Sequence, residues 1–183
     1  MAVMKPEICD FGWKAVDAKL HDGEGRPFQL FELMGENGLV IAFICNHCPF
    51  VKSIATKLQR DAHDLARQGV SFIAISSNDV ENYPEDSPEN MVAFAKESGF
   101  TFPYLYDEDQ SVAKAYGAVC TPDFFGFNNK FELQYRGRLD ATTMTKTSDK
   151  LERDLYIAMT QVAETGKGPK EQTQSMGCSI KWK

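Results

Sequence analysis

Two cysteines separated by two residues are the clearest sign of chemistry in this sequence. Cys45 and Cys48 enclose Asn46 and His47. Thiols at this spacing can close a small disulfide ring within one helical turn, and the thiolate is their reactive form. The spacing therefore predicts a pair that switches reversibly between two thiols and a disulfide.

The elements around the pair are predicted by the apolar pattern. Residues 39–44 are all apolar, which indicates a buried strand. After Cys48, apolar residues recur at helical spacing and indicate a helix over 50–67. We therefore expect Cys45 at a helix N-terminus, where backbone N–H groups and the helix dipole favour its thiolate.

The rest of the sequence predicts an α/β fold. Its central mixed sheet combines parallel strands with an antiparallel hairpin, and helices cover both faces. Further strands are expected over 70–76, 102–106, 123–127 and 131–136, and further helices over 88–98, 109–116 and from about Asp149 onward. Asn128 and Asn129 tolerate positive φ and favour the hairpin turn, while Glu152 favours a capping box in the last helix.

Composition limits the class of protein. We expect one domain over 1–183, with an N-terminal extension over 1–37 and a C-terminal tail over 166–183. The length of 183 residues is ordinary for a domain, and 43% hydrophobic residues suffice for a core. The net charge of −6 argues against nucleic acid as a partner. Because neither a signal-peptide pattern nor a membrane-length apolar stretch is present, the sequence predicts a cytoplasmic protein.

Two landmarks carry a resemblance to the thioredoxin superfamily. They are the cysteine pair after the first core strand, and Thr121–Pro122 before the hairpin. In that superfamily a cis-proline faces the dithiol, and the residue before it offers backbone hydrogen bonds to an extended substrate. The resemblance implies a thioredoxin-like fold, with Thr121 and Pro122 in these roles.

A closer resemblance is to the peroxiredoxin-like, AhpC/TSA-like proteins of the thioredoxin fold. It runs from Phe11 onward and is carried by segments 45–51, 78–79, 120–125 and 177–182. The implied activity is thiol–disulfide exchange without a cofactor. The implied partners are a disulfide-containing protein or a small-molecule thiol substrate, and a cellular thiol reductant. A homodimer is left open.

The resemblance also implies how the pair works. Cys45, as the more exposed cysteine, attacks a substrate disulfide as a thiolate, and Cys48 resolves the mixed disulfide. A protonated His47 would stabilise the thiolate; the alternative is an exposed residue without that role. Asn46 and Pro49 complete the supporting set, since Pro49 falls in the first helical turn.

Two departures from thioredoxins concern this mechanism. Thioredoxins carry Trp before the first cysteine and a buried acid on the preceding strand, whereas this chain has Ile44 and Leu39 there. The usual proton acceptor for the second cysteine is therefore missing, and another group would have to serve.

Thiol peroxidase activity is the first alternative. Peroxiredoxins need a proline and a hydroxyl residue at fixed places before the reactive cysteine. Counted back from Cys48, the proline and hydroxyl positions hold Ile41 and Cys45. Counted back from Cys45, the two positions also lack a proline and a hydroxyl residue. Arg136 or Arg138 could act as the distant arginine, and slow peroxide reduction by an exposed thiolate stays open.

The second alternative is a binding module, using the dithiol for metal or Thr121–Pro122 for a peptide. A zinc site would need a second closely spaced pair. The residues available for it do not form one; they are Cys120, Cys178, His21 and His63. We therefore expect no metal.

The remaining cysteines allow two interpretations each. Cys120, near Pro122, could be an additional redox residue or a small buried residue. Cys178 could be an additional redox residue or a simple exposed or docked thiol. Cys9 is expected to have no role, and the acidic stretch 81–89 is interpreted as a solvated loop.

Overall fold

Seven strands form one mixed sheet, and its middle strands carry the longest apolar runs. The computed structural model describes residues 2–183. β4 (Gly38–Phe43) pairs in parallel with β5 (Val70–Ser76), and α1 (Pro49–Ala66) connects them. β4 is buried at every position, as expected for a strand covered on both faces. The predicted strand–helix–strand unit around the cysteine pair is therefore confirmed.

The other strands extend this sheet on both sides. The order is β3-β2-β6-β5-β4-β8-β9. β6 is parallel to β5, whereas the remaining strands pair antiparallel with their neighbours. Their bounds are β2 Lys19–Asp22, β3 Pro27–Gln29, β6 Tyr104–Tyr106, β8 Asp123–Phe127 and β9 Leu133–Gly137. The predicted mixed sheet is confirmed, and the segment predicted as an N-terminal extension contributes β2 and β3.

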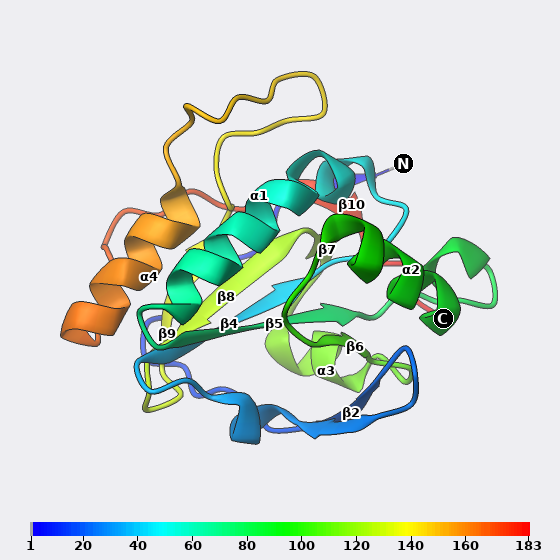
Figure 1. Cartoon of the computed structure of the whole chain (residues 1–183), viewed down its shortest axis with the longest axis horizontal. Helices are drawn as coiled ribbons and strands as arrows, with labels where there is room; N and C mark the ends of the chain where they lie inside the picture. The colour runs from blue at the N-terminus through cyan, green and yellow to red at the C-terminus, as the bar shows by residue number, and fades with distance from the viewer. Residues whose placement is uncertain (1) are drawn as a thin grey trace.

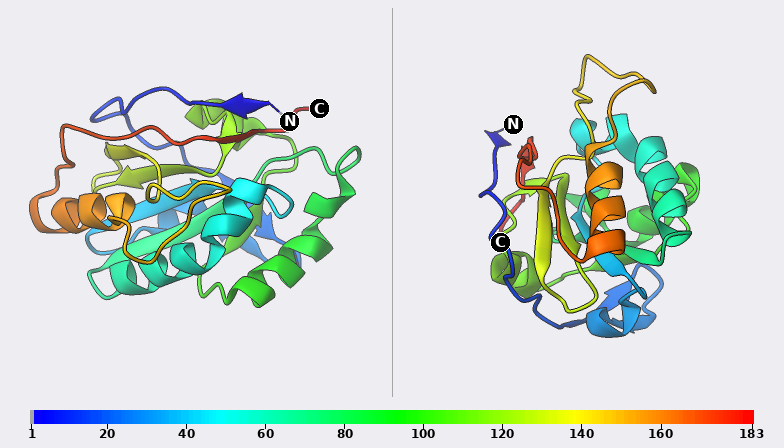
Figure 2. Two further views of the ribbon diagram at one scale, coloured as in Figure 1. Left: turned by 90° about the horizontal axis from the view of Figure 1, so that it is seen from above. Right: turned by 90° about the vertical axis from the view of Figure 1, so that its left-hand side faces the viewer.

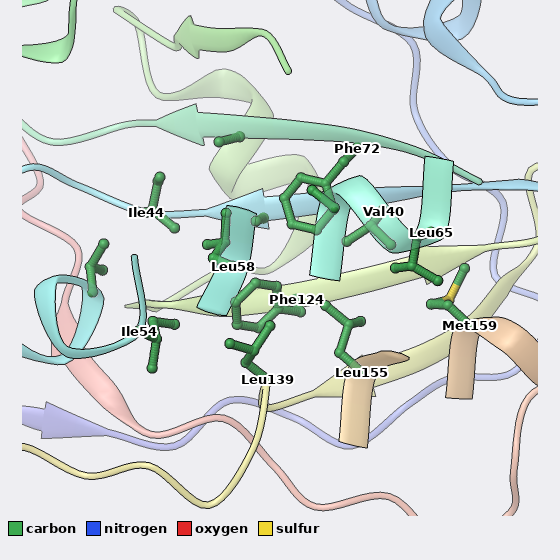
Figure 3. Packing of buried hydrophobic residues seen from close by; sticks show 14 of the residues in the cluster. Val40, Ile44, Ile54, Leu58, Leu65, Phe72, Phe124, Leu139, Leu155 and Met159 are labelled. Atoms are coloured by element: carbon green, nitrogen blue, oxygen red, sulfur yellow. The ribbon is translucent and has the colours of Figure 1, made fainter. Parts of the chain in front are cut away.

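Helices cover both faces of the sheet, as predicted (Figure 1). They are α2 Pro88–Ser98, α3 Ser111–Tyr116 and α4 Asp154–Thr165, besides α1 and the short 3-10 turns Leu30–Leu33 and Pro84–Asp86. On one face Val40 and Phe124 of the sheet pack with Leu58 of α1 and Leu155 of α4 (Figure 3). On the other face Tyr116 of α3 belongs to a separate apolar cluster.

A second sheet of three strands brings the C-terminal segment to the cysteine pair. β10 (Gly177–Ser179) lies between β1 (Val3–Met4) and β7 (Cys120–Thr121), antiparallel to both. Figure 2 shows the N-terminal segment in blue and the C-terminal segment in red running side by side. The segment predicted as a tail therefore contains a strand that is fixed beside the site.

The last helix starts later than predicted. α4 begins at Asp154, so Asp149 and Glu152 form no capping box there. Instead, the backbone N–H of Leu155 donates to the carbonyl of Leu139. Arg153 precedes the helix and forms ion pairs with carboxylates of α1. Tertiary contacts thus replace the expected local cap.

The hairpin turn was also predicted with the wrong residues at positive φ. Phe131 holds the left-handed conformation, with a φ of 60°, rather than Asn128 or Asn129. Asn128 contributes through its side-chain oxygen, which accepts from the backbone N–H groups of Lys130 and Glu132. Phe131 also stacks on Phe31, a contact that offsets part of the cost of this backbone conformation.

A membrane-spanning helix has a characteristic length and apolar composition. Among residues 2–183, no helix combines the length and apolar composition that a bilayer crossing requires.

Candidate active site

The cysteine pair lies in the short connection between β4 and α1. Cys48 is the N-cap of α1 and Pro49 is its first residue, so the prediction for Pro49 is confirmed. The prediction that Cys45 stands at the helix N-terminus is wrong, because Cys48 holds that place. The backbone N–H groups of the first helical turn, which have no partner within the helix, therefore favour a negative charge on Cys48.

Burial and hydrogen bonding shift the pKa values of the two thiols in opposite directions. Cys45 is 1% exposed and Cys48 is 0% exposed, so the expected greater exposure of Cys45 is not found. A hydrogen bond from Cys45, helped by Cys178 and the backbone of Val51, lowers the pKa of Cys48. The same bond, followed by burial and the charge of Asp86, raises the pKa of Cys45. These contacts therefore favour a negative charge on Cys48 over one on Cys45.

Thr121 contacts both sulfurs. Its hydroxyl lies 3.4 Å from Sγ of Cys45, and its carbonyl oxygen lies 3.3 Å from Sγ of Cys48. The peptide bond between Thr121 and Pro122 is cis. The structure therefore brings together the two segments from which the resemblance was drawn, although they are more than seventy residues apart.

Asp86 is the site residue that sequence reasoning missed. Its carboxylate is fully buried and accepts from the backbone N–H of Asn46 at 2.8 Å and of His47 at 3.3 Å. It also lies 2.6 Å from Nδ1 of His47 and accepts from the side-chain amide of Asn78 at 2.8 Å. The stretch 81–89 is therefore no simple solvated loop, because Asp86 holds the backbone beside Cys45.

No local signal distinguishes Asp86 from the acidic residues around it. It ends a 3-10 turn of three residues, and Glu85, its neighbour, is exposed. Its four donors come from two other segments, 46–47 and 78. Only the folded chain joins them.

Asn46 and His47 are neighbours, but the Asn46 side chain is buried and the His47 side chain is partly exposed. The amide of Asn46 is buried; it donates to the carbonyl of Glu85 and accepts from the hydroxyl of Tyr104 at 2.9 Å. The His47 side chain is 29% exposed and its ring stacks on Tyr83. Asn46 therefore fixes the loop, whereas His47 connects the buried carboxylate to the surface.

Two further cysteines lie close to the pair. Sγ of Cys178 is 2.8 Å from Sγ of Cys48, and burial with this contact raises the Cys178 pKa to about 12. Cys120 is fully buried, and its sulfur contacts the carbonyl of Pro122. Cys9 lies elsewhere, half-buried, and burial raises its pKa to about 11. The five cysteines are not joined by disulfides in the structure.

Three side chains could offer ligands to a metal ion. One ligand atom each of Cys45, His47 and Asp86 lies within 4.8 Å of the others. The carboxylate of Asp86 already accepts from two backbone N–H groups and an amide, so it acts first as an acceptor for this loop. His21 and His63 do not join this group, which is the one found among residues 2–183.

The arginines considered for peroxide chemistry are engaged elsewhere. Arg136 pairs with the buried carboxylate of Asp123 at 3.2 Å and donates to the carbonyl of Gly117. Arg138 pairs with Asp154 of α4. The hydroxyl nearest to Cys45 comes instead from Thr121.

A groove lies next to the site. Its volume is about 190 Å³, and its lining includes Phe50 and Ile54 of α1, Pro122, and Thr142. Pro122 thus borders both the cysteine pair and the groove.

Comparison with known proteins agrees with this geometry. A model of the AhpC/TSA family matches residues 11–142. A Mycobacterium tuberculosis protein named as a candidate peroxiredoxin is 27% identical over 115 residues, which cover 63% of this chain and 68% of that protein.

Solved structures show the same fold. An uncharacterized conserved protein from Geobacillus kaustophilus has a TM-score of 0.94 and 44% identity, covering 100% of this chain and 97% of that one. The thioredoxin domain of a thiol-disulfide oxidoreductase from Bacteroides vulgatus has a TM-score of 0.58 and 15% identity, covering 69% of this chain and 86% of that one. The predicted thioredoxin-like fold is therefore confirmed.

Proposed function

Since this chain belongs to the AhpC/TSA family, we propose that it is a thiol–disulfide oxidoreductase whose redox pair is Cys45 and Cys48. The observation that carries the proposal is the contact of both sulfurs with Thr121, beside the cis peptide bond to Pro122. The family supports a thiol oxidoreductase or peroxidase in general. The choice of disulfide exchange rests on the paired thiols and the charge they share.

The reaction moves two electrons from the pair to a substrate disulfide. A proton shift along the hydrogen bond between the thiols makes Cys45 the thiolate, which the Thr121 hydroxyl stabilises. Cys45 attacks one substrate sulfur and the other leaves as a thiolate, which takes the proton from Cys48. Cys48 then attacks Cys45 in the mixed disulfide, releasing the second substrate sulfur and leaving a Cys45–Cys48 disulfide.

The substrate we propose is a disulfide in an extended peptide or a small molecule, reaching the pair along the groove beside Pro122. A cellular thiol reductant would restore the pair. The odd number of cysteines supports a reducing compartment such as the cytoplasm as the location.

The test is a redox titration in glutathione buffers, with alkylation and mass spectrometry to follow each cysteine. We expect a Cys45–Cys48 disulfide with a defined midpoint potential, lost in Cys45→Ser and kept in the matched control Cys9→Ser. A midpoint potential of about −270 mV would make the protein a reductant, and one of about −120 mV would make it an oxidant. Absence of this disulfide at every potential would refute the proposal.

Peroxide reduction is the second candidate, favoured by the family and by the Thr121 hydroxyl beside Cys45. Arg136 and Arg138 stand against it, because both are already paired with carboxylates. Rapid-mixing measurement of peroxide consumption decides between the two. A rate no faster than that of a free thiol would exclude the peroxidase, whereas a much faster rate abolished by Cys45→Ser would establish it.

A further inference from the structure

Cys48 has two sulfur neighbours rather than one. Cys178 lies on β10, directly opposite Thr121 in the strand register, and its residue is 2% exposed. Its Sγ lies 2.8 Å from Sγ of Cys48. A small movement brings two sulfurs from this distance to the bond length of a disulfide, about 2.05 Å.

We propose that Cys178 is a second resolving thiol, and that Cys48 is shared by two alternative disulfides, one with Cys45 and one with Cys178. The proposal deepens the proposed function and rests on it for the first disulfide. The Cys178 thiolate attacks Sγ of Cys48 in the Cys45–Cys48 disulfide. The bond between Cys45 and Cys48 breaks, and Cys45 leaves as a thiolate that takes up the proton lost by Cys178. The exchange needs no external oxidant, since no electrons enter or leave the protein.

Charge makes the second step depend on the first. While Cys48 is reduced, burial and the neighbouring Cys48 sulfur keep the pKa of Cys178 high. Oxidation of Cys48 removes both the charge of Cys48 and its hydrogen bond with Cys178, which raise the Cys178 pKa, whereas Lys181 continues to favour the Cys178 thiolate. Cys178 is thus a poor nucleophile in the reduced protein and a better one once the first disulfide has formed.

Cys120 provides a matched control. It is as buried as Cys48 and precedes Thr121, but its register partner is Ser179 and its sulfur contacts the Pro122 carbonyl. Burial and the charge of Asp123 raise its pKa. We therefore assign it no step in the exchange.

The experiment uses the full chain with Cys45→Ser, treated with oxidised glutathione, acid-quenched, alkylated and mapped by mass spectrometry. Without Cys45, glutathione attached to Cys48 can leave only if another thiol displaces it. We expect a Cys48–Cys178 disulfide with no glutathione retained. Addition of Cys120→Ser should not change this result, whereas addition of Cys178→Ser should leave glutathione on Cys48.

Glutathione persisting on Cys48 while Cys178 stays open to alkylation would overturn the proposal. If Cys45→Ser does not fold, as judged by circular dichroism, the wild-type chain poised in glutathione buffers answers instead. We expect both disulfides there and only Cys45–Cys48 in Cys178→Ser; detection of Cys45–Cys48 alone in the wild type would refute the inference. A Cys48–Cys178 disulfide without any Cys45–Cys48 disulfide would refute the proposed pair but not the second thiol.

Discussion

Replacing Asp86 by Asn tests whether a buried carboxylate holds the cysteine loop and its charge. The substitution keeps the size of the side chain and removes the negative charge. One oxygen can still accept from the backbone N–H groups of Asn46 and His47, now as a neutral acceptor. The new amide cannot accept from Asn78, whose own oxygen is already bonded to the backbone of Lys181.

The expected cost follows from these bonds. Hydrogen bonds to a charged group contribute about 1.5–3 kcal/mol each, roughly twice a neutral bond. The variant loses the Asn78 bond and weakens the two backbone bonds, but it no longer buries a charge. We therefore expect the free energy of unfolding to fall by about 3 kcal/mol. Because the charge of Asp86 raises the pKa of Cys45, the same substitution should lower that pKa.

Urea unfolding measures the stability, and NMR titration of isotope-labelled cysteine follows each thiol. Glu85→Gln is the matched control: it removes a charge one residue away, but from an exposed side chain, so neither quantity should move. A stability loss below about 0.5 kcal/mol, or a Cys45 pKa that stays unchanged or rises in Asp86→Asn, would refute the reasoning.

Three further outcomes are expected. Lys57→Met should cost about 3–5 kcal/mol in denaturant unfolding, because it leaves the buried partner Asp140 uncompensated, while Lys52→Met on the exposed side of α1 should be neutral. Ultraviolet absorbance should show the Cys48 thiolate down to a pH of about 5 and its protonation below that pH. The thiolate absorbance should be absent in Cys48→Ser. His47→Ala should raise the Cys45 pKa, because the buried carboxylate loses a partner that lies 2.6 Å away and its charge acts more fully on the thiol.

Each of these has a result that would contradict it. The exposed His63 on α1 is the control for His47, and an equal shift in both variants would show a general charge effect rather than this contact. Thiolate absorbance lost already near neutral pH would contradict the charge placed on Cys48. Unchanged stability in Lys57→Met would show that the pair with Asp140 is solvated.

Sequence patterns predicted the parts of the fold that depend on neighbouring residues. The apolar run of β4 and the helical spacing of α1 were sufficient to place the cysteine pair between them. The helix predicted over 88–98 is likewise found as α2, and its N-cap is local: the Ser87 hydroxyl accepts from the backbone N–H of Asn90.

The parts that were missed depend on residues far apart in the chain. The start of α4 is set by Leu139 and by carboxylates on α1, and the role of Asp86 is set by two other loops. The preference for charge on Cys48 rather than Cys45 follows partly from the place of the helix start, because Cys48 and not Cys45 is the N-cap of α1. A local pattern contains no information on such partners.

The distance along the chain between Cys48 and Cys178 also has a consequence for biosynthesis. The two residues are 130 positions apart, so the ribosome makes the dithiol loop and α1 long before it makes β10. A nascent chain therefore holds Cys48 without its neighbour, and contacts of such long sequence separation form late in folding. Until β10 has been made and has packed, it does not cover the thiols of the growing chain, which can then be oxidised or bound by a chaperone.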